Sequence, residues 1–178
     1  QYFNLTGRSA LITGATRGIG FGLAAGLAQA GAKIILNGRN PEKLAEATDR
    51  LRLQGVSAQT LCFEVRDQPA VQKAINNYET ADGPIDILIN NAGIQHRQSL
   101  EDFASDKFQD VINTNATALF YLGQAVTRHM KQRGQGKIIN IASIMTKMAR
   151  HHVGAYVTAK AAVGGLTRAM TAEWAAYG

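Results

Sequence analysis

The sequence predicts an α/β protein with a doubly wound parallel sheet in three layers. Short apolar runs bounded by turn residues alternate with longer segments of helical spacing along the 178 residues. This order is typical of chains in which each strand is followed by a crossover helix. The apolar runs show no polar alternation, which is typical of strands buried on both faces. Right-handed crossovers then place helices on both sides of the sheet.

Five segments have the composition of strands. They are residues 9–13, 32–36, 58–63, 85–89 and 137–141. Cys62 is the only cysteine of the chain and falls in the third segment, where we expect a small buried apolar side chain. A single cysteine excludes a disulfide within the chain and fits a reducing cytoplasm.

Five segments have the spacing of helices. They are residues 20–30, 41–53, 68–79, 106–133 and 155–176. The second helix has the clearest boundaries, with Asn40 as the expected N-cap and Pro41 at the first helical position. We expect all ten segments to form one domain over residues 1–178, because this length suits one core and the chain contains no linker or repeat.

Composition narrows the functional classes. Hydrophobic residues make up 46% of the chain and charged residues 18%, as in globular proteins. No apolar run is long enough to cross a bilayer, and the first residues do not resemble a secretory signal, so we expect a cytoplasmic protein. The net charge is +6, but the Lys and Arg residues are scattered, which argues against nucleic acid and favours phosphate groups and an anionic small molecule.

The two ends of the sequence are unusual for a complete chain. It begins with Gln1, and it stops at Gly178 directly after a helical pattern, with no turn or strand following. We therefore expect a C-terminal part of the domain to be missing.

A glycine-rich turn joins the first strand to the first helix. Gly14 suits the tight turn because it tolerates positive φ, and Gly18 lets the backbone approach a pyrophosphate. Gly20 allows the helix to pack closely on the strand. The helix N-terminus would face the phosphates with free N–H groups, so the turn is a candidate dinucleotide site. The residues between the glycines belong to this site too, and they are Thr16, Arg17 and Ile19.

The spacing Gly-x-x-x-Gly-x-Gly, with Thr13 ahead of it, resembles the short-chain dehydrogenase/reductase family. Further motifs follow in family order, and they are Asn90-Asn91-Ala92-Gly93, Asn115, Ser143, Tyr156 and Lys160. The resemblance covers essentially the whole chain. It implies a Rossmann-like fold, a nicotinamide cofactor contacted by Asn90, Ala92 and Gly93, and a homo-oligomer, either a dimer or a tetramer.

Residues after the second and third strands bear on the choice of cofactor. NAD enzymes of this architecture place an acidic residue where this chain has Gly38. Arg39 follows, before Asn40, and its guanidinium suits a 2′-phosphate, as does that of Arg17. We therefore expect NADP(H) rather than NAD(H). Glu64, followed by Val65, stands where the family commonly has an Asp at the adenine edge.

Tyr156 and Lys160 are four residues apart, so they share one face of a helix. Such a pair is usually a pair of surface neighbours, and only its conjunction with the glycine turn favours catalysis. An ammonium nearby favours a phenolate, which suits a proton donor and acceptor. Ser143 would donate a hydrogen bond to the carbonyl oxygen. The resemblance implies that Lys160 also holds the nicotinamide ribose and that Asn115, rather than Asn113, anchors a water of the proton relay.

Residues 90–97 and 124–130 resemble the gluconate 5-dehydrogenase branch of the family. This resemblance implies the interconversion of gluconate and 5-ketogluconate. Arg97 follows the fourth strand and suits a sugar-acid carboxylate, and Arg150 and His151 lie on a loop expected to border the same pocket.

Two alternatives remain open at this point. One is a different reductase of the family, acting on a 3-oxoacyl thioester or a tropinone-type ketone. The other is a non-catalytic NADP-binding sensor, although the intact Ser143, Tyr156 and Lys160 argue against it. A serine hydrolase is disfavoured because no Gly-x-Ser-x-Gly elbow occurs. We expect no metal, since His151 and His152 are adjacent and no cysteine accompanies them.

Overall fold

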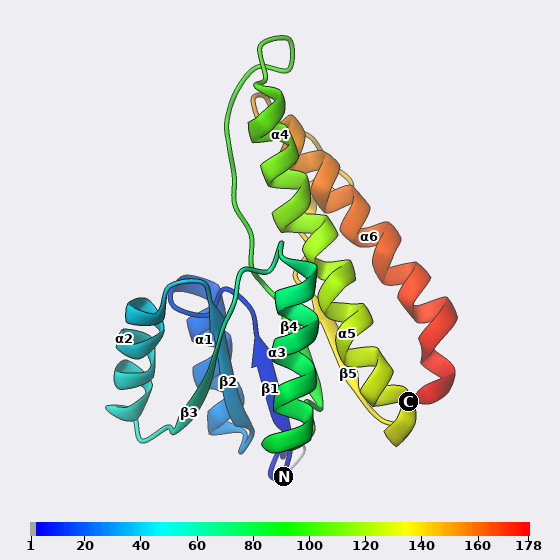
Figure 1. Cartoon of the computed structure of the whole chain (residues 1–178). Helices are drawn as coiled ribbons and strands as arrows, with labels where there is room; N and C mark the ends of the chain where they lie inside the picture. Colours follow the sequence, from blue (N-terminus) through cyan, green and yellow to red (C-terminus); the bar gives the residue numbers. More distant parts are fainter. Residues whose placement is uncertain (1–2) are drawn as a thin grey trace.

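The computed structural model describes residues 3–178 and contains a five-stranded sheet in the order β3-β2-β1-β4-β5 (Figure 1). Every neighbouring pair of strands is parallel, as predicted. The strands are β1 (Ser9–Ile12), β2 (Lys33–Gly38), β3 (Ala58–Cys62), β4 (Ile87–Asn90) and β5 (Lys137–Asn140). Because β1 pairs with both β2 and β4, the strand order reverses beside it, and ligands of such sheets bind at this point.

Residues 3–178 contain six α-helices, which lie close to the five predicted ranges because α4 and α5 divide the predicted helix at 106–133. They are α1 (Gly18–Gln29), α2 (Pro41–Arg52), α3 (Gln68–Ala81), α4 (Ser105–Ile112), α5 (Ala118–Arg133) and α6 (Gly154–Trp174). Helix α2 begins as its sequence predicts. The Asn40 side chain accepts a hydrogen bond of 2.7 Å from the N–H of Lys43, and Pro41 occupies the first turn.

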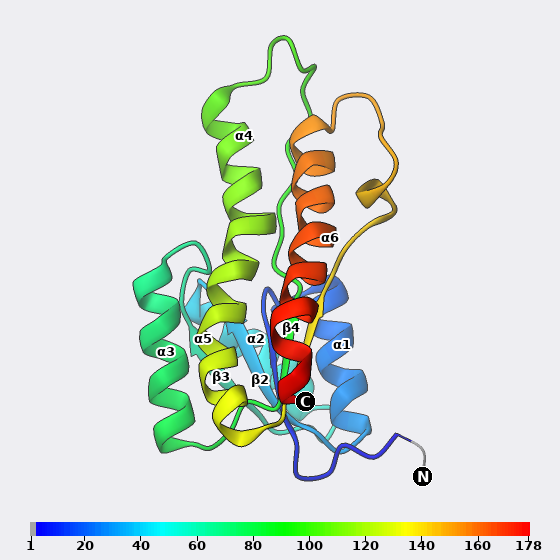
Figure 2. The same cartoon turned by 90° about the vertical axis from the view of Figure 1, so that its right-hand side faces the viewer.

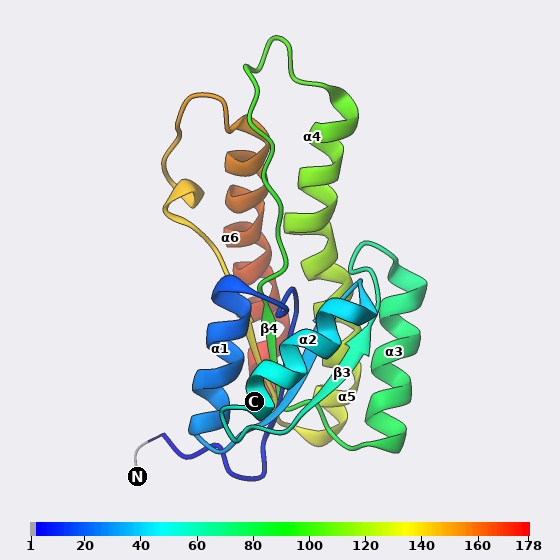
Figure 3. The same ribbon diagram turned by 90° about the vertical axis from the view of Figure 1, so that its left-hand side faces the viewer.

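Two hydrophobic cores lie on opposite faces of the sheet. Along β1, Ala10 and Ile12 belong to the core shared with α1 and α2, whereas Leu11 belongs to the core shared with α3 and α5. This alternation follows from the period of two of an extended strand. Figure 3 shows α1 and α2 on one side of the strands and α3 on the other. The three-layer prediction is confirmed.

The two edge strands differ from the prediction that every strand is buried on both faces. Cys62 in β3 is exposed, so its expected burial is wrong. In β5, Ile139 retains 47% of its accessible surface. Both strands have a sheet neighbour on one side only within residues 3–178, and their side chains are covered less completely than those of the central strands.

The predicted helix at 106–133 contains a change of winding. Helices α4 and α5 are joined without a break by a π-helical turn, Asn113–Thr117. Together they form one continuous helical rod, Ser105–Arg133, and helix α6 runs alongside it (Figure 2). A small core joins the two, formed by Val111, Ala116, Ala155 and Ala159. The rod therefore supports the N-terminal half of α6, which carries Tyr156 and Lys160.

Candidate active site

The glycine turn has the backbone that its sequence predicts. Gly14 has φ +61°, and a Cβ atom at this position would lie 2.9 Å from the Cα of Ala92. A Cβ on Gly20 would lie 2.5 Å from the Asn91 side-chain nitrogen. Only glycine allows the turn after β1 to approach the segment after β4 this closely.

Hydrogen bonds hold these two segments together. The Thr13 Oγ1 accepts from the backbone N–H groups of Asn91 and Ala92, both at 3.0 Å. The Asn91 amide donates to the carbonyl oxygens of Thr13 at 2.9 Å and Gly14 at 3.2 Å. Thr13 and Asn91 thus hold the turn after β1 against the segment after β4, a role that the motifs alone did not assign.

A hollow of about 550 Å³ opens beside the glycine turn, at the carboxyl ends of β1, β2, β3 and β4. It brings together most of the residues predicted to contact a dinucleotide, namely Gly14, Thr16, Arg17, Gly18, Ile19, Gly20, Arg39, Glu64, Val65, Ala92 and Gly93. Its wall also contains residues that were not predicted, namely Asn37, Gly38, Phe63, Arg66, Asn91, Ile94, Asp110 and Thr114. Residues from four separate loops therefore meet in one place.

Four residues predicted to contact the cofactor lie outside this lining, namely Asn40, Asn90, Tyr156 and Lys160. The Asn40 side chain caps α2. The Asn90 side chain is 1% exposed and donates a hydrogen bond of 2.8 Å to the Oδ1 of Asn140 in β5. Both side chains are engaged in holding secondary structure.

The chemistry of the hollow fits a dinucleotide phosphate. Helix α1 begins at Gly18 with no side-chain cap and no acidic residue in its first turn. Its positive end is therefore not neutralised within the helix. A Cβ built on Gly18 meets nothing within 4 Å, so the space in front of this terminus is open. Arg17 and Arg39 are exposed beside it and add positive charge.

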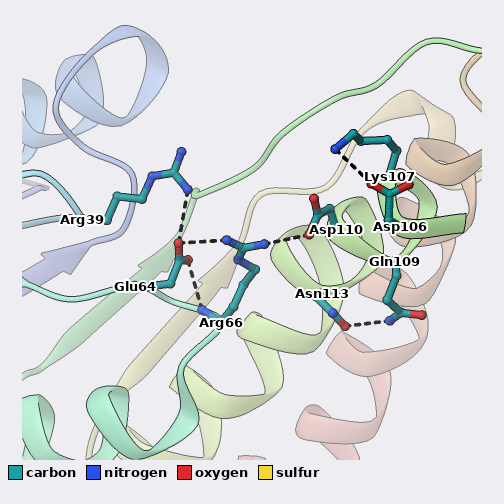
Figure 4. A network of polar contacts seen from close by, with 8 residues as sticks. All are labelled: Arg39, Glu64, Arg66, Asp106, Lys107, Gln109, Asp110 and Asn113. Carbon is teal, nitrogen blue, oxygen red and sulfur yellow. Dashed lines mark hydrogen bonds and ion pairs between the residues drawn. The ribbon is translucent and has the colours of Figure 1, made fainter. Parts of the chain in front are cut away.

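A chain of four alternating charges crosses the wall of the hollow (Figure 4). Arg39 lies 3.2 Å from Glu64, Glu64 lies 3.2 Å from Arg66, and Arg66 lies 2.8 Å from Asp110. Burial alone raises the pKa of Glu64, but hydrogen bonds from Arg66 and Arg39 outweigh burial and hold the pKa below its usual value. Glu64 is therefore a carboxylate shared between two guanidinium groups.

Lys160 is a buried and hydrogen-bonded member of the predicted catalytic set. It is 5% exposed, and its Nζ donates a hydrogen bond of 2.5 Å to the carbonyl of Ile141. Burial lowers the pKa of its ammonium. The Nζ lies 5.7 Å from the centroid of the Tyr156 ring. Helical spacing and this bond together place the ammonium between Tyr156 and the segment after β5.

Ser143 lies in that segment, at the start of a 3₁₀ turn, Ile144–Thr146. Its Oγ accepts a hydrogen bond of 3.2 Å from the N–H of Met145, which leaves its own O–H available as a donor. Residues on both sides of Ser143 contact Lys160. Ile141 accepts the hydrogen bond from the Lys160 Nζ, and the Thr146 hydroxyl donates to the Lys160 carbonyl at 3.2 Å. Ser143 is thus held beside α6.

The structure separates Asn115 from Asn113. Asn115 lies in the π-helical turn, is fully buried, and makes two hydrogen bonds of 2.8 Å to the backbone N–H and C=O of Ile94. Asn113 instead accepts a hydrogen bond from Gln109 along the exposed helix surface. Only Asn115 connects the rod to the segment after β4.

Arg97 lies at a second hollow, of about 590 Å³, between the loops that follow β4 and β5. Its lining is basic and consists of Arg97, Gln98, Ala149, Arg150, His151 and His152. The N–H of Gln98 donates to the His152 carbonyl at 3.1 Å, which pins the two loops together. His152 has φ +61°, an uncommon conformation for a residue with a side chain. The structure therefore brings Arg97, Arg150 and His151 together at one hollow, and their contact with a substrate stays a prediction.

No group of three His, Cys, Asp or Glu side chains within residues 3–178 is arranged to hold a metal ion. Over the same residues, no helix is both long and apolar enough to cross a membrane.

Comparison with known proteins agrees with this geometry. A family model described as short chain dehydrogenase matches residues 8–178. Gluconate 5-dehydrogenase of Gluconobacter oxydans is 48% identical over 176 residues, which are 99% of this chain and 69% of that protein. The 5-keto-D-gluconate 5-reductase of Escherichia coli strain K12 is 42% identical over 98% of this chain and 69% of its own length. The structure of a gluconate 5-dehydrogenase from Burkholderia cenocepacia in complex with NADP and tartrate has a TM-score of 0.95 and 48% identity, covering 99% of this chain and 69% of that one.

Proposed function

Because this chain belongs to the short-chain dehydrogenase family, and is thereby an oxidoreductase acting on a CH–OH group, we propose that it interconverts gluconate and 5-ketogluconate with NADP(H). Two observations support the proposal. A hollow lined by arginines opens beside the glycine turn, and the buried Lys160 ammonium lies close to Tyr156, with Ser143 held beside α6. The high identity to two enzymes named for gluconate and its 5-keto form supports the substrate.

The cofactor side of the proposal rests on charge. Gly38 supplies no carboxylate to hold a ribose 2′-hydroxyl, and Arg39 and Arg17 line the hollow. A guanidinium binds a phosphate through two parallel hydrogen bonds, so these residues favour the 2′-phosphate of NADP(H). The gluconate 5-dehydrogenase from Burkholderia cenocepacia, which was solved with NADP, is consistent with this assignment.

When bound, the nicotinamide accepts or donates the hydride. The protein's own residues handle the proton. During oxidation the Tyr156 phenolate takes the proton of the substrate hydroxyl, and during reduction the phenol returns it to the alkoxide. The Lys160 ammonium stabilises the phenolate, and the Ser143 O–H donates to the reacting oxygen as its charge grows.

Asn115 supports the same reaction from the π-helical turn. Its side chain forms two hydrogen bonds to the backbone of Ile94, so it holds the segment after β4 against the rod. In the proposed relay, the π-helical turn that carries Asn115 holds a water. A π-helical turn is well suited to this role, because local departures from α-helical winding are frequent at functional sites.

We assign the substrate carboxylate to Arg97. The hollow that contains Arg97 also receives Arg150, and the charge of these two guanidinium groups favours an anion. A bidentate contact with the carboxylate would fix the end of the sugar acid away from the reacting carbon. We also propose that the protein is cytoplasmic, because a chain with a single cysteine suits a reducing compartment. The family resemblance further supports a homo-oligomer, either a dimer or a tetramer.

The decisive experiment measures oxidation of gluconate with NADP⁺ and with NAD⁺, alongside gluconamide as an uncharged analogue. We expect turnover of gluconate, a preference for NADP⁺, and a much higher KM for gluconamide. Rapid reduction of a 3-oxoacyl thioester without turnover of gluconate would refute the substrate assignment. Binding of NADPH with no turnover across a broad panel of ketones would identify a sensor instead.

Tyr156→Phe tests the chemistry separately from binding. We expect kcat to fall by about 10²-fold or more, because a general acid–base group contributes roughly 10²–10⁴-fold. Binding of NADPH, measured by calorimetry, should persist. Tyr177→Phe removes the same hydroxyl from an exposed position near the C-terminus and should keep normal activity. Near-normal turnover of Tyr156→Phe would disprove the assigned role.

A further inference from the structure

Arg66 stands in the wall of the hollow beside the adenosine end of the proposed cofactor site, and neither the motifs nor the proposed mechanism uses it. It follows β3, and its side chain lies between two carboxylates, Glu64 and Asp110 (Figure 4). No phosphate-binding role follows from its position alone, because its guanidinium is already held by two carboxylates. The significance of Arg66 lies in what it does to Glu64.

Glu64 competes with the 2′-phosphate of the proposed cofactor for the Arg39 guanidinium. Its Oε2 lies 3.2 Å from the Arg39 guanidinium, the group that we assign to the 2′-phosphate. Arg39 cannot bind the phosphate fully while it is held by Glu64. A carboxylate left unpaired there would also repel the phosphate, because like charges at close range disfavour each other.

Arg66 removes both difficulties. Its guanidinium lies 3.2 Å from the Glu64 Oε2, and its backbone N–H donates to the Oε1 at 3.3 Å. Glu64 therefore keeps a cationic partner when Arg39 turns away. Arg66 is in turn held by Asp110 of α4 at 2.8 Å.

Exposure indicates which arginine can move. The Arg39 side chain is 70% exposed and has one ion-pair partner, whereas Arg66 is 34% exposed and has two. Arg39 is thus the mobile partner and Arg66 the fixed one. The network can release Arg39 without leaving Glu64 uncompensated.

We propose that Arg66 is a positioning residue that sets the preference for NADP(H) over NAD(H), by holding the Glu64 carboxylate so that Arg39 is free to bind the 2′-phosphate. The inference rests on the proposed function, because it presupposes that NADP(H) is the preferred cofactor. It assigns Arg66 no contact with the cofactor. Its effect passes entirely through Glu64.

The test is the ratio of the Kd values of NAD⁺ and NADP⁺, measured by calorimetry without substrate at fixed ionic strength. Arg66→Gln should lower the NADP⁺ preference by about tenfold, the equivalent of roughly one charge-assisted hydrogen bond. Arg52→Gln is the matched control. Arg52 forms an exposed pair with Asp49 on α2, away from the hollow, and its loss should leave the ratio unchanged.

Replacing Glu64 distinguishes a positioning role of Arg66 from a direct contact between Arg66 and the cofactor. In a Glu64→Gln background, Arg66→Gln should no longer change the ratio by more than about twofold, because coupling between the two residues carries the whole effect. Arg66→Lys keeps the charge but loses the fork, and it should lose about threefold. Arg66→Lys carries the test if Arg66→Gln does not fold.

Two results would overturn the inference. One is an unchanged ratio in Arg66→Gln or, if that variant does not fold, in Arg66→Lys. The other is a loss that persists in the Glu64→Gln background, which would make Arg66 a direct ligand. A wild-type protein that prefers NAD⁺ would instead refute the proposed cofactor, and this outcome is visible before any variant is made.

Discussion

Replacing Asn115 by alanine should destabilise the protein markedly, because this side chain connects two segments that are far apart in the sequence. It is fully buried and bonds both backbone groups of Ile94 at 2.8 Å. Alanine removes both bonds and leaves an N–H and a C=O without their partner. It also leaves a cavity of the size of a carboxamide.

The magnitude follows from these losses. Each hydrogen bond contributes about 1 kcal/mol net, and a partly buried group left unsatisfied adds roughly another 0.5–1 kcal/mol. For two bonds and two groups, the sum is about 3–4 kcal/mol in the free energy of unfolding. With a urea m-value of about 2 kcal/mol/M, the unfolding midpoint should fall by roughly 1.5–2 M.

Urea unfolding followed by circular dichroism is the assay, with Asn113→Ala as the matched control two residues earlier. Asn113 bonds only Gln109 along the exposed helix surface, so its loss should stay within about 0.5 kcal/mol. If the two variants lose the same stability, the connection from Asn115 to Ile94 does not have the role assigned here. A change in m-value would indicate that the denatured state, not the native bond, was altered.

Two further predictions concern the cofactor hollow. Gly14→Ala should weaken NADP⁺ binding more than tenfold by calorimetry, because Gly14 has φ +61° and the added Cβ would lie 2.9 Å from the Cα of Ala92. The control is Gly22→Ala in α1, where the added Cβ meets nothing within 4 Å and should raise the stability of the protein by about 0.5–1 kcal/mol. Equal NADP⁺ binding in the two variants would contradict the close approach of Gly14 to Ala92. Burial raises the pKa of Glu64, but its arginine partners outweigh burial and lower it below 4.5, so its ion pairs should stabilise the fold above that pH and cease to do so as the pH falls through the lowered pKa. Glu64→Gln should accordingly lose up to about 1 kcal/mol at pH 7 and progressively less below pH 4.5 in urea titrations, and a difference that does not depend on pH would refute the pairing.

Local signals predicted the elements of this fold well. The N-cap at Asn40 and the positive φ at Gly14 depend on a few neighbouring residues, so the sequence specifies them directly. The strand-to-helix alternation predicted the parallel sheet for the same reason. The prediction failed at Cys62, because the position of a strand within a sheet depends on which segments pair, and β3 lies at the edge.

The candidate site divides in the same way. Motif spacing identified the glycine turn and the relation of Ser143 to the Tyr156–Lys160 pair, since these motifs sit at fixed places relative to the ends of strands and helices. It could not find Arg66. The signal was present, as a charged residue two positions after Glu64, but its meaning depends on Asp110, which is 44 residues away.

By itself, the sequence determined the order of strands and helices, the glycine-rich turn after β1, and the face of the last helix that carries Tyr156 and Lys160. Each of these depends on backbone periodicity and on residues close together in the chain. The tertiary structure decided that Asn115 rather than Asn113 faces inward, that Arg97 meets Arg150, and that Glu64 is shared between two arginines. These facts depend on which distant segments the sheet brings to one edge, and hydrogen bonds and ion pairs act only over the few ångströms that such packing creates.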